Sequence, residues 1–261
     1  MMHRALAQPF EATPSLGARL RVRERPFERG PLMLQSWREL LFLHWEADAE
    51  TIQRTLPQGL RVDAFEGRAY LGLVAFALEG VRPRFLPRLP GLSDFLELNV
   101  RTYVHDRRGT PGIWFYSLDA NGWLAVETAR AAYHLPYEHA EMETVVNGAA
   151  EVTYRCRRRA TETAPSLFVY RKRGDVRRAR PGTLAFFLIE RYVLFAQAKG
   201  SGRLYAARVW HKPYLLGSIE LLTWDTRLLT LDGLPAPIEE PAHAMRSPGV
   251  DVEVFAPRPI A

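Results

Sequence analysis

The segment Glu97-Leu-Asn-Val-Arg-Thr-Tyr-Val104 carries the clearest strand pattern of the chain. Successive side chains of a strand point to opposite faces of the sheet. One face therefore holds Leu98, Val100, Thr102 and Val104, and the other holds Glu97, Asn99, Arg101 and Tyr103. An ordinary antiparallel sheet exposes its polar face to water. In a closed barrel the same face would line the interior and form the polar floor of a pocket.

Further strands are predicted on both sides of this segment, wherever apolar and polar residues alternate between turn residues. They cover residues 60–64, 69–78, 113–118, 151–159, 166–170, 203–210 and 250–255, and the first segment extends over residues 95–105. Three helices are predicted: one capped by Asp48 that ends before Pro57, one capped by Asn121 over residues 122–134, and one capped by Thr183 over residues 184–196. This balance indicates a β-rich (α+β) fold, an antiparallel barrel or sandwich with a few flanking helices.

The composition restricts the possible chemistry but does not identify a reaction. The chain has 261 residues, of which 47% are hydrophobic and 25% charged, and these values exclude a wholly disordered, collagen-like or coiled-coil chain. Its formal net charge is +6, but among its 35 basic residues the only lysines are Lys172, Lys199 and Lys212. Because arginine is a poor nucleophile and base, amine chemistry is limited to these three candidates.

The two ends of the chain and its cysteine content indicate its organisation. We expect a loosely ordered N-terminal tail over residues 1–24 and a single domain over residues 25–261. The single cysteine, Cys156, allows no internal disulfide and indicates a reducing, cytoplasmic setting. No signal peptide is recognisable, and no apolar run approaches the roughly 20 residues that cross a bilayer, so no membrane contact is expected.

Several polar residues outside the central strand are also candidates for a site. His44 and Glu190 lie beside apolar residues and could face a pocket, although such residues are more often structural. The segment from His134 to Glu141 concentrates two histidines and two carboxylates, but its spacing matches no zinc motif, so we expect no metal and no cofactor. Ten arginine or lysine residues between Arg155 and Arg180 could follow a phosphate backbone. No recognised RNA-binding motif interleaves aromatic residues with them, so nucleic acid is not the favoured partner.

Several long motifs, in order from about Arg25 to Phe255, carry a family resemblance. They are Trp37-Arg-Glu-Leu-Leu-Phe-Leu-His-Trp45, Leu56-Pro-Gln-Gly-Leu60, Glu97 to Val104, Trp114-Phe-Tyr-Ser-Leu-Asp-Ala120, His134-Leu-Pro-Tyr137, Arg180-Pro-Gly-Thr-Leu-Ala-Phe-Phe-Leu-Ile-Glu-Arg-Tyr192, Gly202-Arg-Leu-Tyr205 and Ser247-Pro-Gly-Val-Asp251. Together they resemble the uncharacterised bacterial family DUF2071 (YqjF-like), which is grouped with the acetoacetate decarboxylase-like superfamily. The resemblance implies an antiparallel β-barrel with flanking helices around a small cavity, and it favours the interior for Glu97, Asn99, Arg101 and Tyr103.

The same resemblance implies that one well-known activity is missing. Acetoacetate decarboxylases place a Schiff-base lysine and a second lysine directly after a proline in a helix-to-strand connection. The corresponding segment here is Pro136-Tyr137-Glu138, so tyrosine and glutamate stand where both lysines would be. Tyr137 cannot form an imine, and Glu138 would raise the pKa of a nearby amine rather than lower it. We therefore predict no acetoacetate decarboxylase activity.

Two functional hypotheses follow. In the first, the barrel binds or transforms a small oxo- or hydroxy-acid-like anion: Arg101 would hold its charge, and Glu97, Tyr137 or Glu138 would be the catalytic candidates. Its ligand-binding residues would be Glu97, Asn99, Arg101, Tyr103, His44 and Glu190. Glu97 and Arg101 lie roughly 13 Å apart along an extended strand, so a ligand or cross-strand neighbours would separate them. In the second hypothesis, a non-enzymatic module binds an anionic polymer or partner through the basic region from Arg155 to Arg180.

Overall fold

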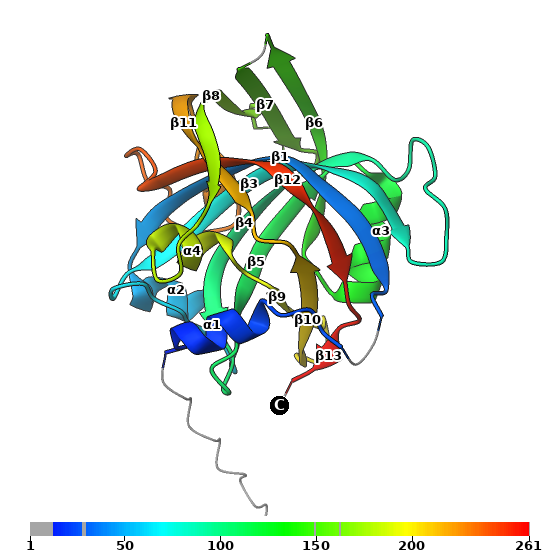
Figure 1. Cartoon of the computed structure of the whole chain (residues 1–261), viewed down its shortest axis with the longest axis vertical. Helices are drawn as coiled ribbons and strands as arrows, with labels where there is room; N and C mark the ends of the chain where they lie inside the picture. The colour runs from blue at the N-terminus through cyan, green and yellow to red at the C-terminus, as the bar shows by residue number, and fades with distance from the viewer. Residues whose placement is uncertain (1–12, 28–29, 149, 162, 261) are drawn as a thin grey trace, which may run out of the picture.

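The computed structural model describes residues 13–27, 30–148, 150–161 and 163–260 (Figure 1). Its helices are α1 (Leu16–Val22), α2 (Ala49–Thr55), α3 (Trp123–Tyr133), α4 (Leu184–Ile189) and α5 (Arg227–Leu231). Its strands are β1 (Met33–Ala47), β2 (Arg61–Val62), β3 (Ala69–Pro83), β4 (Phe95–His105), β5 (Pro111–Ala120), β6 (Tyr137–Asn147), β7 (Glu151–Arg158), β8 (Ser166–Arg178), β9 (Val193–Gln197), β10 (Leu204–His211), β11 (Leu215–Thr223), β12 (His243–Val254) and β13 (Arg258–Pro259). The predicted β-rich class with a few flanking helices is confirmed. Within these described ranges, no helix is long and apolar enough to cross a membrane.

The strands form one sheet that closes on itself twice. The first circuit, which we call the seven-strand ring, contains the strands in the order β12, β1, β3, β4, β5, β9 and β10, and it closes by the pairing of β10 with β12. In the second, the nine-strand ring, β12, β1, β3, β4 and β5 continue through β6, β7, β8 and β11, which rise to the top of Figure 1. The pairings are antiparallel as expected, except that β5 runs parallel to both β6 and β9.

Strand β4 and the central parts of β1 and β3 are buried on both faces because each face belongs to a different ring. Along β1, Leu40 and Phe42 join the core of the seven-strand ring, whereas Leu41 and Leu43 join the core of the nine-strand ring. Such a strand needs an uninterrupted apolar run, and residues 40–43 supply one. The same alternation along β4 sends Leu98 and Val100 into the nine-strand ring and leaves the opposite, polar face for the seven-strand ring.

Two of the three predicted helices need correction. The helix predicted over residues 184–196 ends at Ile189, and residues 193–197 form β9, because pairing with β5 and β10 closes the seven-strand ring. The side chain of Asn121 does not cap α3; its Oδ1 accepts a hydrogen bond from the Leu96 backbone N–H at 2.8 Å, and Gly122 occupies the N-cap position. The Asp48 cap of α2 is confirmed, since Asp48 Oδ2 accepts from the Thr51 N–H at 2.7 Å.

The N-terminal region holds an element that the sequence patterns did not predict. Helix α1 lies within the predicted loose tail, and its Arg19 forms a two-point ion pair with the buried Asp63, at 2.6 and 2.7 Å. Residues 1–12 of that tail lie outside the described residues. The division into a tail and a single domain stays a prediction.

Candidate functional site

A cavity of about 510 Å³ occupies the interior of the seven-strand ring. Its walls come from the inward faces of the ring strands, from one side of α3 and from the loop that joins β3 to β4. Most of this wall is apolar, with Trp37, Phe42, Phe76, Phe95 and Phe115 among its larger side chains. Its buried polar groups lie on β4 and on the segments that face it, so the inward face of β4 organises the site.

The structure places the polar face of β4 inside this ring. Glu97, Asn99 and Arg101 line the cavity and are only 3%, 3% and 7% exposed. This face therefore lies inside the ring and not on the outer surface, contrary to the ordinary antiparallel pattern. The reason is topological: β4 belongs to both rings, so neither of its faces is left at the surface.

Glu97 is held by two neighbours and is unusually easy to protonate. Its Oε2 accepts a hydrogen bond from the Tyr137 hydroxyl at 2.7 Å, and its Oε1 accepts one from Asn99 Nδ2 at 3.3 Å. Burial raises the pKa of Glu97 to about 7, although both hydrogen bonds act in the opposite direction. Burial and the neighbouring carboxyl also raise the pKa of Tyr137 well above its ordinary value, so Tyr137 remains a neutral donor.

Arg101 offers a buried positive charge with unused hydrogen-bond donors. Its guanidinium carbon lies 5.7 Å from the ring centres of both Phe42 and Tyr103. Its Nε and Nη2 have no hydrogen-bond partner among the residues that the structure describes, and the same holds for Oδ1 of Asn99. Buried polar groups are normally paired, so these atoms indicate that the cavity is built to receive a polar group, most simply an anion.

A second arginine, which the sequence patterns did not single out, also reaches the cavity. Arg191 follows α4, and its Nη1 pairs with Asp63 at 2.6 Å while its Nε donates to the Phe187 carbonyl at 2.6 Å. Its Nη2 has no partner within the described ranges. Burial lowers the pKa of Arg191 to about 10, against the opposing effect of Asp63. Asp63 and Arg191 are far apart in sequence, and no motif links them.

Two predicted ligand-binding residues lie behind the cavity wall instead of lining it. The Tyr103 hydroxyl lies 2.7 Å from Nε2 of His44, and Nδ1 of His44 lies 2.9 Å from Nδ1 of His243. Burial lowers the pKa of both imidazoles, to about 4 for His243, so both are neutral at physiological pH. His44 and Tyr103 therefore lie behind Arg101 and are not among the residues that line the cavity.

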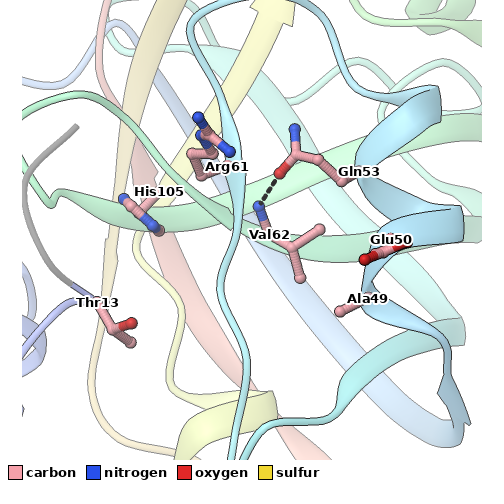
Figure 2. A pocket seen from close by; sticks show the side chains of 7 residues that line it. All are labelled: Thr13, Ala49, Glu50, Gln53, Arg61, Val62 and His105. Atoms are coloured by element: carbon pink, nitrogen blue, oxygen red, sulfur yellow. Dashed lines mark hydrogen bonds between the residues drawn. The ribbon is translucent and has the colours of Figure 1, made fainter. Parts of the chain in front are cut away.

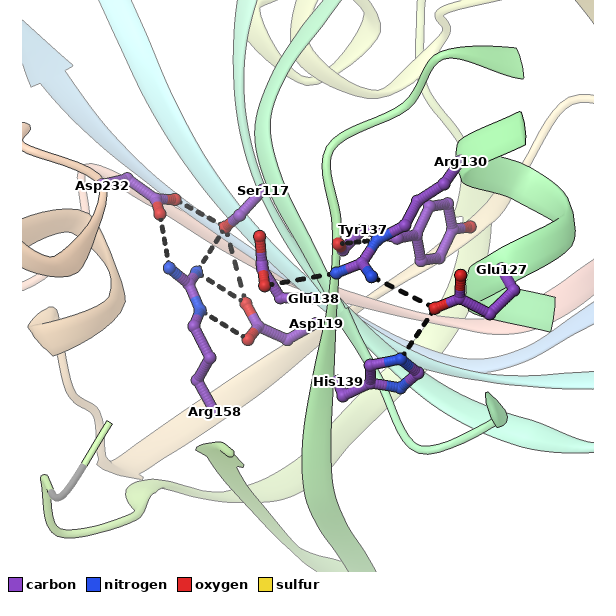
Figure 3. Close-up of polar contacts among 9 residues, drawn as sticks. All are labelled: Ser117, Asp119, Glu127, Arg130, Tyr137, Glu138, His139, Arg158 and Asp232. Atoms are coloured by element: carbon purple, nitrogen blue, oxygen red, sulfur yellow. Dashed lines mark hydrogen bonds and ion pairs between the residues drawn. The ribbon is translucent and has the colours of Figure 1, made fainter. Parts of the chain in front are cut away.

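Glu190 and Glu138 are also outside the cavity. Glu190 is buried, and its carboxylate accepts hydrogen bonds from the Tyr192 hydroxyl and from the Tyr214 N–H. Glu138 projects from the face of β6 opposite Tyr137 and lies 3.4 Å from the Arg130 guanidinium, as Figure 3 shows. A strand sends neighbouring side chains to opposite faces, so Tyr137 and Glu138 could not both enter one cavity.

None of the three lysines reaches the cavity. Lys199 and Lys212 are exposed, and Lys172 forms an ion pair with Glu39 at 2.5 Å and does not line the cavity. The position after Pro136 places the Tyr137 hydroxyl against Glu97 in the cavity. A phenol therefore stands where the resemblance would place an amine.

The nine-strand ring contains a buried ionic network. Arg158 donates to both oxygens of Asp119 at 2.8 and 2.9 Å and to Asp232 at 2.9 Å (Figure 3). Ser117 accepts from Arg158 at 2.8 Å and donates to Asp232 at 2.5 Å. These groups satisfy one another and connect β5, β7 and the end of α5, so the network is structural.

A second hollow, of about 320 Å³, lies at the surface between α2 and β2 (Figure 2). Gln53 lines it, but its Oε1 accepts from the Val62 N–H at 3.0 Å and its Nε2 donates to the Leu60 carbonyl at 3.1 Å. The Gln53 side chain therefore holds β2 against α2. The cavity of the seven-strand ring, with its unpaired buried donors, is the stronger candidate.

The basic region does not form an uninterrupted cationic surface. Five of its ten cations form ion pairs, because Arg157 pairs with Glu141, Arg158 with Asp119, Arg171 with Glu151, Lys172 with Glu39 and Arg173 with Glu220. Partnered cations offer less charge to a phosphate backbone. This arrangement disfavours the polymer-binding hypothesis.

Comparisons with known proteins agree with this architecture. A family described as DUF2071, uncharacterized conserved protein, matches residues 34–251. The uncharacterized protein YqjF of Bacillus subtilis is 35% identical over 210 residues, which cover 80% of this chain and 85% of that protein.

Solved structures show the same fold at low sequence identity. The enduracididine biosynthesis enzyme MppR complexed with pyruvate superposes with a TM-score of 0.62 at 15% identity and covers 91% of this chain and 93% of its own. An acetoacetate decarboxylase gives a TM-score of 0.61 at 15% identity over 90% and 91% of the two chains. The acetoacetate decarboxylase of Legionella pneumophila gives 0.59 at 15% identity over 91% and 93%. The acetoacetate decarboxylase-like fold implied by the sequence resemblance is confirmed.

Proposed function

The chain belongs to the DUF2071 family, and from that premise we propose that it binds or transforms a small anion of the oxo- or hydroxy-acid class. The site is the cavity of the seven-strand ring. The chemistry proceeds without a Schiff-base lysine.

The observation that carries this proposal is the buried guanidinium of Arg101 with two unused donor nitrogens, Nε and Nη2. A carboxylate or enolate oxygen would complete these hydrogen bonds and balance the charge, and such charge-assisted bonds are stronger than neutral ones. A neutral ligand would satisfy the donors but would leave the buried charge unbalanced. An anion is therefore the better match.

Glu97 and Tyr137 supply a proton-transfer group beside that anion site. With a pKa of about 7, Glu97 is close to half ionised at neutral pH, which suits a general acid or base. As a carboxylate it can take a proton from the carbon next to a carbonyl group. The electron pair of the broken C–H bond then moves onto the carbonyl oxygen, where Arg101 would stabilise the resulting enolate.

The absence of a lysine from the cavity supports chemistry without an imine. Neither a phenol nor a carboxylic acid can condense with a carbonyl group to give a Schiff base. MppR, which shares the fold, has been solved in complex with pyruvate, which is an oxo acid. That complex concerns MppR alone, but it supports an oxo acid as a candidate ligand for this chain.

Binding can be tested by calorimetry with pyruvate, acetoacetate and 3-hydroxybutyrate on wild-type protein and on Arg101→Met. The loss of one partner from a buried charge pair should weaken binding about thirtyfold or more. Arg155→Met, at an exposed arginine outside the cavity, is the matched control and should bind like wild type. Equal affinity of Arg101→Met and wild type for every acid that binds would refute the role of Arg101.

Catalysis can be separated from binding by hydrogen–deuterium exchange at the carbon next to the carbonyl group, followed by NMR in heavy water. Glu97→Gln should retain binding and lose the exchange. Treatment with borohydride in the presence of acetoacetate should add no mass to the protein. A borohydride-trapped adduct on a lysine would overturn the imine-free chemistry.

A further inference from the structure

We propose that the preferred ligand is an elongated amphiphile: a carboxylate whose unbranched apolar body runs from Arg101 toward the mouth of the cavity. This inference rests on the proposed anion site and adds to it the chemical class of the rest of the ligand. Three features of the cavity support it: its length, the distribution of its polar groups, and its rim.

The cavity is much longer than a three-carbon acid. Phe95, Glu97, Asn99 and Arg101 line it at every second position of β4. The six residue steps from Phe95 to Arg101 span about 20 Å in an extended strand. The volume of about 510 Å³ lies within the range of roughly 300–1,000 Å³ that is typical of pockets for drug-sized ligands. A ligand as short as pyruvate would leave most of this space empty.

The polar groups of β4 are confined to one part of that length. Glu97, Asn99 and Arg101 are deeply buried, whereas the walls nearer the mouth are mostly hydrocarbon, with Leu78 and Val81 among them and Gln35, Arg82 and Ser93 as polar exceptions. Water in such a section has few hydrogen-bond partners. Methylene groups that replace it should each raise the affinity by up to about fourfold on full burial.

The rim of the cavity is formed by leucines that remain half exposed. Leu32, Leu86, Leu89, Leu92 and Leu124 all line the cavity and are between 44% and 56% exposed. They come from three separate segments: the residue before β1, the loop between β3 and β4, and the first turn of α3. In Figure 1 this loop lies beside α3. An apolar body that leaves the cavity would cover these side chains, which a small polar acid cannot do.

The test is calorimetry with the straight-chain series acetate, butanoate, hexanoate, octanoate and decanoate at one pH. Affinity should rise by up to about fourfold per methylene until the rim is reached. An affinity that is flat or falls with chain length would overturn the inference.

A variant pair locates the apolar body. Ala129 lies on the cavity side of α3, whereas Ala131 is exposed and lies outside the cavity lining. Ala129→Phe narrows the apolar section, so it should reduce the affinity for decanoate at least tenfold and leave acetate unchanged. Ala131→Phe should change neither. Equal decanoate affinity in both variants would contradict the placement of the chain.

Arg101→Met separates this inference from the proposed function. If affinity still rises with chain length but Arg101→Met has no effect, the anion site fails and the apolar section stands. If Arg101→Met abolishes binding while chain length has no effect, the anion site stands and the amphiphile fails.

Discussion

Replacement of Glu97 by glutamine should change how the stability of the protein depends on pH. Burial raises the folded-state pKa of Glu97 to about 7, whereas an unfolded chain has the ordinary value of 4.5. The folded protein therefore binds this proton more tightly than the unfolded chain does. The resulting stabilisation is complete below pH 4.5 and is lost as the pH rises through about 7.

The size of the effect follows from the difference between the two pKa values. A pKa difference of one corresponds to about 1.4 kcal/mol, so the full contribution is about 3 kcal/mol. About 2.5 kcal/mol of it should disappear between about pH 5 and about pH 8. Glutamine cannot ionise, but it can still accept the hydrogen bond of Tyr137, so Glu97→Gln should lack this loss.

The assay is urea unfolding followed by tryptophan fluorescence at both pH values. The free energy of unfolding of Glu97→Gln minus that of wild type should rise by about 2.5 kcal/mol from the lower to the higher pH. Other titrating groups cancel in this difference. Glu143→Gln, at an exposed glutamate, is the control and should give a constant difference. A change below about 0.5 kcal/mol for Glu97→Gln would refute the reasoning, because even a difference of one between the folded-state and unfolded-state pKa corresponds to about 1.4 kcal/mol.

Three further predictions concern the scaffold. Arg158→Ala should lower the free energy of unfolding by about 3–5 kcal/mol, because it leaves Asp119 and Asp232 buried without their cation. The control Arg157→Ala removes an exposed ion pair and should lower it by about 1 kcal/mol or less. Urea unfolding at neutral pH measures both values. Gly72→Ala would place a methyl group 3.0 Å from Cδ2 of His44 and 3.3 Å from the Tyr103 hydroxyl. It should therefore destabilise the fold by about 1–3 kcal/mol in thermal unfolding and weaken anion binding in calorimetry. Normal anion binding would mean that His44 and Tyr103 do not position Arg101. Burial raises the pKa of the Cys156 thiol, so Ellman's reagent should react with it only after unfolding, and rapid labelling of the native protein would contradict its burial.

The absence of an amine from the cavity distinguishes this chain from Schiff-base chemistry on the same fold. The phenol of Tyr137 and the carboxyl of Glu97 form one hydrogen-bonded pair inside the ring. This pair can move a proton but cannot form an imine. Arg101 and Arg191 supply positive charge nearby without a nucleophile. The proposed function therefore relies on this positive charge and on proton transfer, with no lysine in the cavity lining.

The sequence by itself determined the local patterns of this protein. The alternation from Glu97 to Val104 placed four polar side chains on one face of a strand, and the scarcity of lysine limited amine chemistry to three candidate residues. The same alternation could not say whether that face meets water or a cavity, because a strand has the same period in an open sheet and in a closed ring. The helical spacing from Ala185 continues to Phe195 in the sequence, yet Val193–Gln197 form β9 in the folded protein.

Only the tertiary structure decided which of the candidate residues meet. Closure of the seven-strand ring through β9 and β10 encloses the face of β4, so Glu97, Asn99 and Arg101 line a cavity with Tyr137. It also adds Arg191, which no local motif connects to β4, and it leaves His44, Tyr103, Glu138 and Glu190 outside the cavity lining. The physical reason is that the alternation of side chains between the two faces of a strand is a local property. Whether a face lies inside a ring depends on which distant strands pair with each other. The sequence thus established which side chains share a face, and the pairing of β9 with β5 and β10 established what that face encloses.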